Sequence, residues 1–319
     1  MTRPVFSVDL AAVPDAFTGG TVAIGNFDGV HRGHQAVLAA AMAGPKPALA
    51  LTFEPHPRAY FGREPIFRLT PPEQKARVCE AFGLDGLVIA RFDAELAGLD
   101  AAAFSREVLC HTLRARQVVV GHDFKFGKGR SGNAESLGAI GRADGFGVTV
   151  VPGFADGDGE VVSSSRIRAC LAQGDVVGAA RLLGYRYQLS EVVVHGKKRG
   201  RAMGYPTANQ NLTPENELRQ GIYAVRMKID GTWRDGVASF GRRPTFDNGP
   251  PVLETFVFDF DGDLYDQRLA VAFYAFLRPE MKFDGMDTLI AQMDEDSRNA
   301  RAHLAGVAPL SPLDAKLNF

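Results

Sequence analysis

The amino-acid sequence predicts a two-domain protein of the α/β plus β class: a Rossmann-like doubly wound parallel sheet, then an antiparallel β-barrel of the Greek-key type. In the first half, short apolar runs alternate with helical segments, which is typical of crossover units. After about Leu183 the runs become rich in β-branched and aromatic residues separated by glycine or proline turns, which favours a closed barrel. The 319 residues are comfortable for two domains, which we expect at residues 1–184 and 185–319.

The expected strands of the first domain are five apolar runs bounded by turn residues, at residues 21–24, 48–53, 86–90, 117–120 and 148–151. Thr70, followed by Pro71 and Glu73, predicts a capping box at a helix start. Asp100 and Asn133 are the expected N-caps of two further helices. Parallel strands end at one edge of a sheet, so the loops at residues 25–34 and 121–127 are expected on the same edge.

The second domain is expected to build its barrel from strands at residues 192–194, 222–229, 237–240, 253–260 and 269–276. A single helix over about residues 285–304 follows them. The last dozen residues contain Pro309 and Pro312, and we expect them to form a loose tail.

The composition limits the classes of function that fit this chain. A formal net charge of −1 argues against bulk binding to nucleic acid or to an anionic membrane. No apolar run approaches the roughly 18 residues of a membrane span. Cys79, Cys110 and Cys170 have no C-x-x-C spacing, which favours reduced thiols over a zinc site or a disulfide framework. We expect a soluble, cytoplasmic protein that handles phosphate locally.

The segment T-V-A-I-G-N-F-D-G-V-H-R-G-H-Q-A-V-L, at residues 21–38, has the pattern of a nucleotide phosphate site. A short apolar strand leads into a loop in which Gly25 and Gly29 let the backbone approach a ligand closely. The next helix begins at about Gly33, and its free N–H groups favour an anion. His31 and His34 lie at that helix end, where their rings can face one ligand. The alternative is one capping histidine and one surface histidine.

Three further stretches follow predicted strands or open a helix: E-P-H-P at residues 54–57, G-H-D-F-K-F-G at residues 121–127 and S-S-S-R-I-R at residues 163–168. The third combines serine hydroxyls, free backbone amides and Arg168, a combination that suits phosphate. Alone, it is equally an ordinary serine cap, and Asp123 and Lys125 are equally turn residues. Their convergence on one sheet favours a ligand site.

The second half contains the densest basic run of the chain, in the segment V-H-G-K-K-R-G-R-A-M-G-Y-P-T-A-N at residues 194–209. The run suits a phosphate-binding loop, a solvated turn or a nucleic-acid patch. Thr207 and Asn209 follow on an extended segment, where they face the same side and can hold Mg²⁺ together with ATP oxygens. Glu254 is expected on one strand face with Phe256, Phe258 and Phe260, either as a general base or as a solvent-exposed carboxylate.

The four motifs of the first half, G-N-F-D-G-V-H-R-G-H, T-F-E-P-H-P, G-H-D-F-K-F-G and S-S-S-R-I-R, resemble the adenylyltransferase half of the prokaryotic bifunctional riboflavin kinase/FAD synthetases, a branch of the nucleotidyltransferase superfamily. The resemblance implies that ATP binds on the loop that contains Gly25, Asn26, Phe27 and Asp28. It places His31 and His34 on the phosphates, Asp123 beside FMN, and completes the phosphate cradle with Ser164, Ser165 and Arg168. Ser165 stands where the family usually has threonine, and it keeps the hydroxyl.

The strings G-K-K-R-G-R-A-M-G-Y-P-T-A-N, G-I-Y-A-V, G-V-A-S-F-G-R-R-P-T-F and L-E-T-F-V-F-D-F-D-G-D-L-Y resemble the riboflavin kinase module of the same family. This resemblance implies that Thr207 and Asn209 bind Mg²⁺ and ATP, within a site that includes Gly196 and Arg201. It also implies that Glu254 is the base acting on the ribityl 5′-hydroxyl. Gln210 departs from the leucine that commonly follows P-T-A-N.

The resemblance predicts a bifunctional flavin-cofactor enzyme with riboflavin, FMN, FAD and ATP as its small-molecule partners. The barrel would phosphorylate riboflavin, and the first domain would adenylylate FMN and release pyrophosphate. Two alternatives stay open from the sequence: a nucleotidyltransferase with an RNA-binding barrel, and a non-catalytic flavin-binding regulator. The sequence does not predict the oligomeric state.

Overall fold

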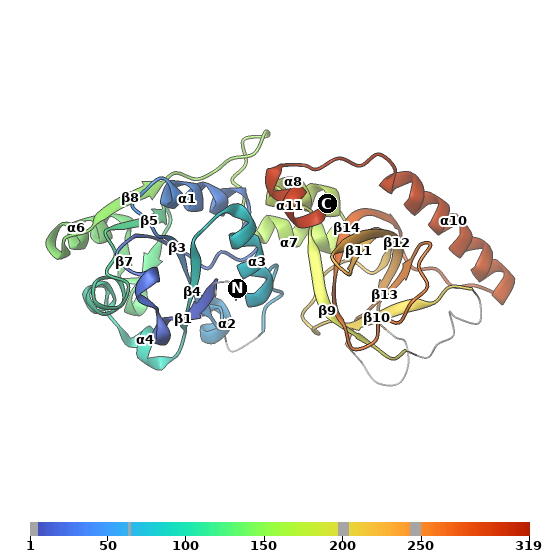
Figure 1. The fold of residues 1–319 in the computed structure, drawn as a ribbon, viewed down its shortest axis with the longest axis horizontal. Helices are drawn as coiled ribbons and strands as arrows, with labels where there is room; N and C mark the ends of the chain where they lie inside the picture. Colours follow the sequence, from blue (N-terminus) through green and yellow to red (C-terminus); the bar gives the residue numbers. More distant parts are fainter. Residues whose placement is uncertain (1–5, 63–64, 197–203, 243–249) are drawn as a thin grey trace. The chain divides into compact units, whose positions relative to one another are not determined.

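The structure is a computed structural model that describes residues 6–62, 65–196, 204–242 and 250–319. The chain divides into two compact units, Met1–Ser164 and Ser165–Phe319 (Figure 1). The helices α7 (Ser164–Gln173) and α8 (Val176–Leu183) group with the second unit, apart from the first residue of α7. The expected functional division after residue 184 stays a prediction.

The first unit is built on a parallel sheet whose strand order is β1-β4-β3-β2-β5-β8. These strands are β1 (Ser7–Asp9), β2 (Thr21–Ile24), β3 (Ala48–Glu54), β4 (Gly86–Arg91), β5 (Gln117–Gly121) and β8 (Gly147–Val151). All five expected strands are confirmed, and β1 is an addition. The chain order runs outward from β2 in both directions, which is the doubly wound arrangement.

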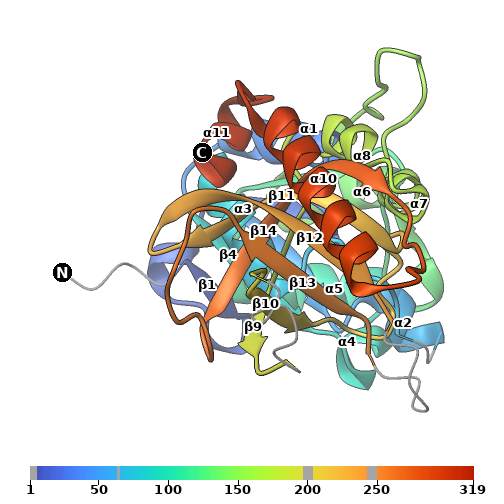
Figure 2. The ribbon, with the colours of Figure 1, turned by 90° about the vertical axis from the view of Figure 1, so that its right-hand side faces the viewer.

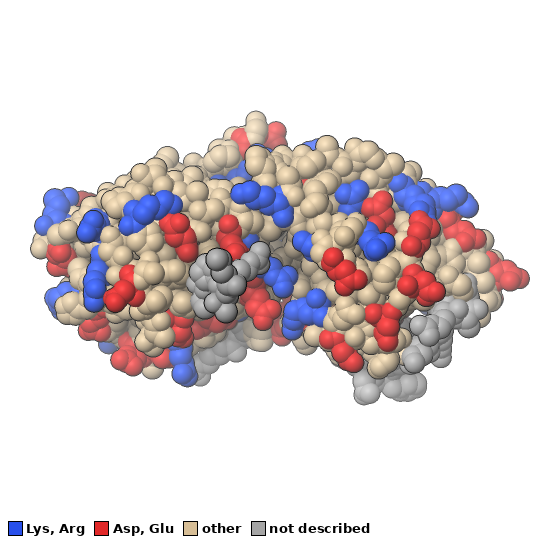
Figure 3. Space-filling model, viewed as in Figure 1, with Lys and Arg blue, Asp and Glu red and all other residues tan. Residues whose placement is uncertain are grey.

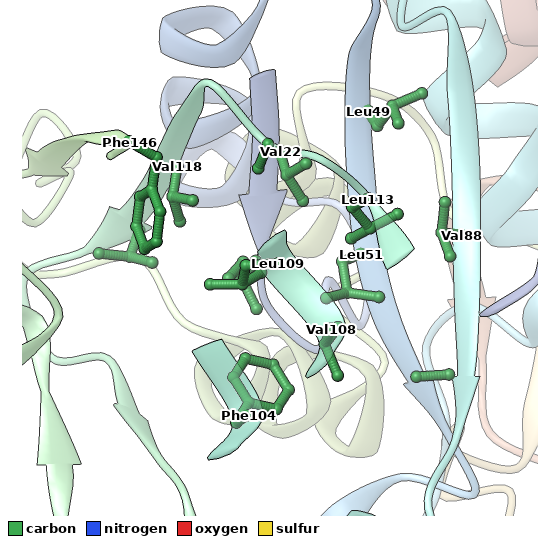
Figure 4. Close-up of a cluster of buried hydrophobic side chains, with 14 of the residues drawn as sticks. Val22, Leu49, Leu51, Val88, Phe104, Val108, Leu109, Leu113, Val118 and Phe146 are labelled. Atoms are coloured by element: carbon green, nitrogen blue, oxygen red, sulfur yellow. The ribbon is translucent and has the colours of Figure 1, made fainter. Parts of the chain in front are cut away.

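Helices cover both faces of this sheet. They are α1 (Arg32–Met42), α2 (Pro57–Gly62), α3 (Pro72–Phe82), α4 (Ala94–Gly98), α5 (Ala101–Phe104), a π-helical segment (Ser105–Thr112) and α6 (Ala134–Asp144). A small hairpin of β6 (Lys125–Phe126) and β7 (Gly132–Asn133) follows β5. Side chains of α5 and the π-helical segment pack on the face formed by Val22, Leu51 and Val118 (Figure 4), and α1 contacts β2, β3 and β5.

Two of the three expected helix caps are confirmed. The Asp100 side chain accepts a hydrogen bond from the Ala103 N–H, and Asn133 forms a capping box with Ser136. The Thr70 cap is wrong, because α3 begins one residue later than the motif predicts, with Pro71 at its N-cap. The Thr70 hydroxyl instead accepts a hydrogen bond from the Gly29 N–H at 2.8 Å.

The second unit contains a closed antiparallel barrel with the strand order β10-β13-β12-β11-β14-β9, in which β9 also pairs with β10. The strands are β9 (Gln188–Val194), β10 (Thr207–Asn211), β11 (Gly221–Ile229), β12 (Thr232–Gly241), β13 (Val252–Val257) and β14 (Arg268–Arg278). The strands β11, β12 and β13 are consecutive in the chain and adjacent in the sheet, and β14 then returns to pair with β11. This arrangement is a Greek key. The strand expected at residues 253–260 ends three residues early, at Val257.

The expected terminal helix is α10 (Met286–Leu304), which packs across β11, β12 and β14 (Figure 2). The expected loose tail is wrong. Residues Pro312–Asn318 form α11, with Ser311 as N-cap and Pro312 in its first turn. The buried Asp314 carboxylate of α11 forms an ion pair with Arg186, whose guanidinium lies 4.5 Å from the Tyr274 ring centre. These contacts fix the C-terminal segment against the barrel.

In the parts of the chain that the structure describes, no helix combines the length and the hydropathy that a membrane crossing requires. Acidic and basic side chains are interspersed on the face drawn in Figure 3.

Candidate active sites

The loop between β2 and α1 has a strained backbone held by buried side chains. Phe27 and Val30 have positive φ angles of 46° and 40°, which side chains rarely adopt, and Gly29 has 87°. Phe27 and Val30 are both buried. Such a conformation persists only where the surroundings over-determine it, and it is a common feature of ligand-binding loops.

Asp28 anchors this loop to the segment before α3. Its Oδ1 accepts hydrogen bonds from the Leu69 N–H at 3.0 Å and the Thr70 N–H at 3.1 Å. Its backbone carbonyl accepts a hydrogen bond from the Ser164 hydroxyl at 2.8 Å. The carboxylate expected at the ATP loop is therefore buried and supports the loop from beneath, which the sequence did not indicate.

His31 and His34 meet at the start of α1. His31 is the N-cap, and its Nδ1 accepts a hydrogen bond from the His34 N–H at 3.3 Å. The two rings stack with centroids 3.6 Å apart, and the Phe27 ring meets His34 edge-on at 5.4 Å. A Cβ on Gly33 would lie 3.1 Å from the His31 ring, so a glycine there allows the ring to lie close against the helix. His31 therefore caps the helix, as the alternative expects, whereas His34 packs against the His31 and Phe27 rings and is not a surface residue. That both rings face one ligand stays a prediction.

Burial keeps both imidazoles neutral. Desolvation lowers the pKa of His31 to about 4, partly opposed by its own backbone hydrogen bond and by the Asp123 charge. Desolvation, followed by the charges of His31 and Lys75, lowers the pKa of His34 well below its usual value. Because Nδ1 of His31 is an acceptor, the proton of its neutral ring lies on Nε2, where it can be donated to a ligand. Nδ1 of His34 is buried and has no hydrogen-bond partner among the described residues.

A buried lysine lies against the same loop, and sequence analysis missed it. Lys75 of α3 donates to the Asn26 carbonyl at 2.6 Å and to the Thr52 hydroxyl at 2.9 Å. Desolvation lowers its pKa to about 8, against the favourable charge of Asp28. A lysine on an amphipathic helix is ordinarily a surface residue, so only the fold identifies this one.

The expected neighbouring loop, residues 121–127, lies at the same edge of the sheet, because β2 and β5 are adjacent and parallel. Asp123 is exposed on this loop, and its charge acts on His31.

At the end of β3, the Glu54 carboxylate forms a two-pronged ion pair with Arg68. Of the expected phosphate cradle, Ser164 belongs to the first unit, whereas Ser165 and Arg168 lie on α7 in the second. Their joint action stays a prediction.

In the barrel, three expected site residues come together across two strands. Asn209 of β10 is directly opposite Glu254 of β13, and Thr207 is opposite Phe256. Directly opposed residues of antiparallel strands point to the same face, and residues two apart on one strand share that face. The expected grouping of Thr207, Asn209 and Glu254 is therefore present. Phe258 and Phe260 lie beyond the end of β13, so only Glu254 and Phe256 of the expected four-residue face belong to the strand.

The Asn209 side chain is oriented by its neighbours. Its Nδ2 donates to the Thr207 carbonyl at 3.1 Å and to Thr207 Oγ1 at 3.3 Å. A Cβ on Gly196 would lie only 2.6 Å from Asn209 Oδ1. Glycine at this position therefore leaves the space that the Asn209 amide oxygen occupies.

A cavity of about 430 Å³ is lined by Gly196, Thr207 and Asn209 together with residues of the β13–β14 connection, among them Phe260 and Tyr265. The Tyr265 ring lies 3.8 Å from that of His195. Among the described residues that line this cavity, Glu254 is absent. It lies beside the cavity, opposite Asn209. The basic residues Lys197, Lys198, Arg199 and Arg201 lie outside the described residues.

Gln210, the departure from the family pattern, faces away from Asn209 because successive side chains of a strand alternate. It is buried, and its Nε2 donates to the Glu191 carbonyl at 2.7 Å and the Leu269 carbonyl at 2.8 Å. The glutamine thus links β10 to β9 and β14, away from the face that carries Thr207 and Asn209.

The side chains available as metal ligands in the described residues indicate which kind of metal ion could bind. No group of three or more His, Cys, Asp or Glu side chains within them is placed to hold a metal ion. Thr207 and Asn209 supply two neutral oxygens, which suit an ion that takes most of its ligands from phosphates and water.

Two family models cover most of the chain: one described as FAD synthetase matches residues 14–166, and one described as riboflavin kinase matches residues 183–304. Curated relatives named bifunctional riboflavin kinase/FMN adenylyltransferase include one from Listeria monocytogenes, 37% identical over 89% of this chain and 92% of the relative. Another, from Pseudomonas fluorescens, is 38% identical over 89% and 93%. A crystal structure titled as a macrolide-efflux protein from Streptococcus pneumoniae matches with a TM-score of 0.81 and 29% identity, over 93% of this chain and 99% of that one. By its family models and its curated relatives, the chain belongs to the bifunctional riboflavin kinase/FMN adenylyltransferase family.

Proposed function

We propose that this chain converts riboflavin to FAD in two ATP-dependent steps, and that the residues described above carry them. The barrel phosphorylates riboflavin to FMN, and the parallel-sheet unit adenylylates FMN and releases pyrophosphate. The observation that supports this assignment most directly is the stacked pair of neutral histidines at a helix N-terminus, beside a strained glycine loop.

In the proposed adenylyl transfer, an oxygen of the FMN phosphate attacks the α-phosphorus of ATP, and the bond to the bridging oxygen of the β-phosphate breaks. The FMN phosphate is already anionic near neutral pH, so the attack needs no general base. The chain's task is to position the phosphates and to stabilise the charge that develops on them. His31 Nε2–H and the N-terminus of α1 donate to the ATP phosphates, and His34 acts on the same group. Ser164, Ser165 and Arg168 complete the cradle, and Asp123 lies beside FMN.

In the proposed phosphoryl transfer, Glu254 accepts the proton of the riboflavin 5′-hydroxyl while its oxygen attacks the γ-phosphorus of ATP. The bond from the γ-phosphorus to the bridging oxygen breaks, and ADP leaves. Asn209, directly opposite Glu254, brings the nucleotide side of the site next to the base. The cavity lined by Gly196, Thr207 and Asn209 takes the ATP phosphates.

Mg²⁺ fits the Thr207 and Asn209 oxygens, and we propose that they hold it together with the ATP phosphates. When bound, the ion would neutralise phosphate charge. The chain's own part is to aim the Asn209 amide, through its hydrogen bonds to Thr207 and the absence of a Cβ at Gly196.

Incubation with riboflavin, ATP and Mg²⁺, followed by chromatographic separation of the flavins, tests the whole assignment. FMN followed by FAD is expected. Unchanged riboflavin together with bound flavin would favour the non-catalytic regulator. Salt-sensitive retention on RNA would favour the RNA-binding alternative. We further propose a cytoplasmic location, which the three free thiols favour.

A further inference from the structure

Lys75 is a buried cation under the proposed ATP loop. Its side chain projects from α3, and the residue is 2% exposed. Lysine is almost never fully buried unless a partner satisfies it. Here the ammonium donates to the Asn26 carbonyl at 2.6 Å and to Thr52 Oγ1 at 2.9 Å, while the Thr52 hydroxyl itself donates to the Asn26 carbonyl at 2.9 Å. The three groups form a closed network centred on the Asn26 carbonyl oxygen.

This network determines the direction of the peptide group that opens the loop. In a planar trans peptide, the carbonyl of one residue and the N–H of the next point in opposite directions. With the Asn26 carbonyl held towards Lys75, the Phe27 N–H points away from it. Phe27 has a φ of 46°, so the same contact supports a turn that the side chain would otherwise disfavour.

The charge of Lys75 is a second feature that a neutral donor would not supply. Burying an ammonium is unfavourable, and a neutral amide could satisfy a carbonyl at a lower desolvation cost. Asp28 and Glu54 are the acidic groups whose charges favour the ammonium, and Arg68 opposes it. The retained charge lies beside a loop whose proposed ligand carries several negative charges.

We propose that Lys75 is a positioning residue for adenylyl transfer, and that it holds the Asn26 carbonyl so that the loop after β2 is preformed for the phosphates of ATP. This inference rests on the proposed placement of ATP on that loop. When the loop is already ordered, the binding of ATP does not have to supply the free energy that ordering the loop would cost. The loss of Lys75 therefore weakens ATP binding in FMN adenylylation and leaves riboflavin phosphorylation unaffected.

The test compares Lys75→Met with Lys46→Met in the full-length protein, because Lys46 is an exposed lysine of the same unit that pairs with Asp85 at 2.9 Å. For Lys75→Met, the KM for ATP in FMN adenylylation should rise by about tenfold or more, because losing a hydrogen bond from a charged donor typically changes an equilibrium constant by that factor. The KM for ATP in riboflavin phosphorylation, measured on the same sample, should change by less than about twofold. Lys46→Met should leave both values unchanged.

A merely structural role gives a different result, because partial misfolding reduces the number of active molecules and lowers kcat while KM stays the same. An unchanged KM for ATP in Lys75→Met would therefore overturn the proposal. Should this variant not fold, Thr52→Val removes one member of the network with little change in shape, and its KM for ATP should rise by about threefold. An unchanged KM in Thr52→Val would then overturn the proposal.

Two further measurements separate this inference from the function on which it rests. The effects of Lys75→Met and Thr52→Val should be non-additive in the double variant, since the two side chains share one network. His34→Ala reports on the ATP site itself. If His34→Ala abolishes FMN adenylylation while Lys75→Met has a normal KM for ATP, only the role of Lys75 is wrong. If His34→Ala has no effect, the placement of ATP on this loop is wrong as well.

Discussion

The His31 and His34 rings stack with centroids 3.6 Å apart, and His31 Nδ1 accepts a hydrogen bond from the His34 N–H. Two imidazolium cations at this separation would repel each other strongly. Burial removes that conflict by keeping both rings neutral. The hydrogen bond also fixes the His31 tautomer, so that one ring N–H remains available to a phosphate.

The pH behaviour of these rings is the first prediction. His31 should keep its neutral form down to about pH 4, and His34 should stay neutral well below the usual histidine range. Nuclear magnetic resonance titration of the imidazole carbon-bound protons measures this directly, with His31→Gln and His34→Gln variants to assign the signals. A His31 midpoint close to 6.5 would contradict the burial argument.

The same depressed pKa values predict how the stability of the protein depends on pH. Below about pH 6.5 the unfolded histidines take up protons that the folded ones do not, so the unfolded state binds more protons and stability rises with pH. For His31, the free energy of unfolding should fall as the pH drops from about 6.5 towards 4, and then level off. Denaturant titrations at several pH values test this, and the slope should weaken in His31→Gln.

His34→Ala should lower FMN adenylylation by about 100-fold or more, the usual cost of losing a donor to transition-state charge. Riboflavin phosphorylation on the same chain should be unchanged. His111→Ala is the matched control, because His111 is an exposed histidine of the same unit. The loss of both activities in a folded His34→Ala protein would contradict the assignment of the two sites to separate units.

Glu254→Gln should produce the opposite pattern. Without a general base, FMN formation from riboflavin should fall by a factor of about 100 to 10,000, while FAD formation from supplied FMN continues. Glu191→Gln alters a carboxylate of the same barrel that pairs with the exposed Arg268, so it serves as the control. Riboflavin phosphorylation that survives in Glu254→Gln would exclude Glu254 as the base.

Gly196→Ala tests how the Asn209 amide is positioned. The new Cβ would lie 2.6 Å from Asn209 Oδ1, so one of the two groups must move. We expect the KM for ATP in riboflavin phosphorylation to rise by about tenfold, as for a displaced ligand group, with no change in FMN adenylylation. Gly285→Ala is the control, since its Cβ would meet no atom within 4 Å. Equal effects of the two substitutions would contradict the positioning role.

The sequence predicted most of the fold, because buried parallel strands have apolar runs that turn residues delimit clearly. It missed β1 (Ser7–Asp9), which is three residues long, pairs with β4 alone and has no apolar run. It assigned Thr70 to a local cap, but Gly29, distant in sequence, uses the Thr70 hydroxyl. Local patterns do not reveal such long-range partners.

The residues proposed to bind ligands belong to local sequence motifs, whereas the residues that support those motifs do not. Strand alternation predicted that Thr207 and Asn209 share a face, and the family resemblance added Glu254, which the structure places opposite Asn209. Lys75, Thr52 and the structural role of Asp28 depend on burial, which the sequence does not show. The start of α11 has a local signal, because Ser311 followed by Pro312 is typical of a helix N-terminus. The expectation of a loose tail gave more weight to the two prolines, Pro309 and Pro312, than to this signal.

Asp314 provides the prediction that tests the corrected C-terminal segment. Its fully buried carboxylate pairs with Arg186 and accepts hydrogen bonds from the Arg186 N–H at 2.8 Å, the Leu310 N–H at 2.9 Å and Asn318 Nδ2 at 2.7 Å. Asp314→Asn leaves the Arg186 charge buried without its counterion, which should lower the free energy of unfolding by about 3–5 kcal/mol. Asp259→Asn breaks an exposed pair with Arg301 in the same unit and should leave stability unchanged. Denaturant unfolding followed by the fluorescence of Trp233, the single tryptophan, reports on this barrel. A loose tail would make the two variants equally stable, whereas a docked α11 makes only Asp314→Asn unfold at lower denaturant.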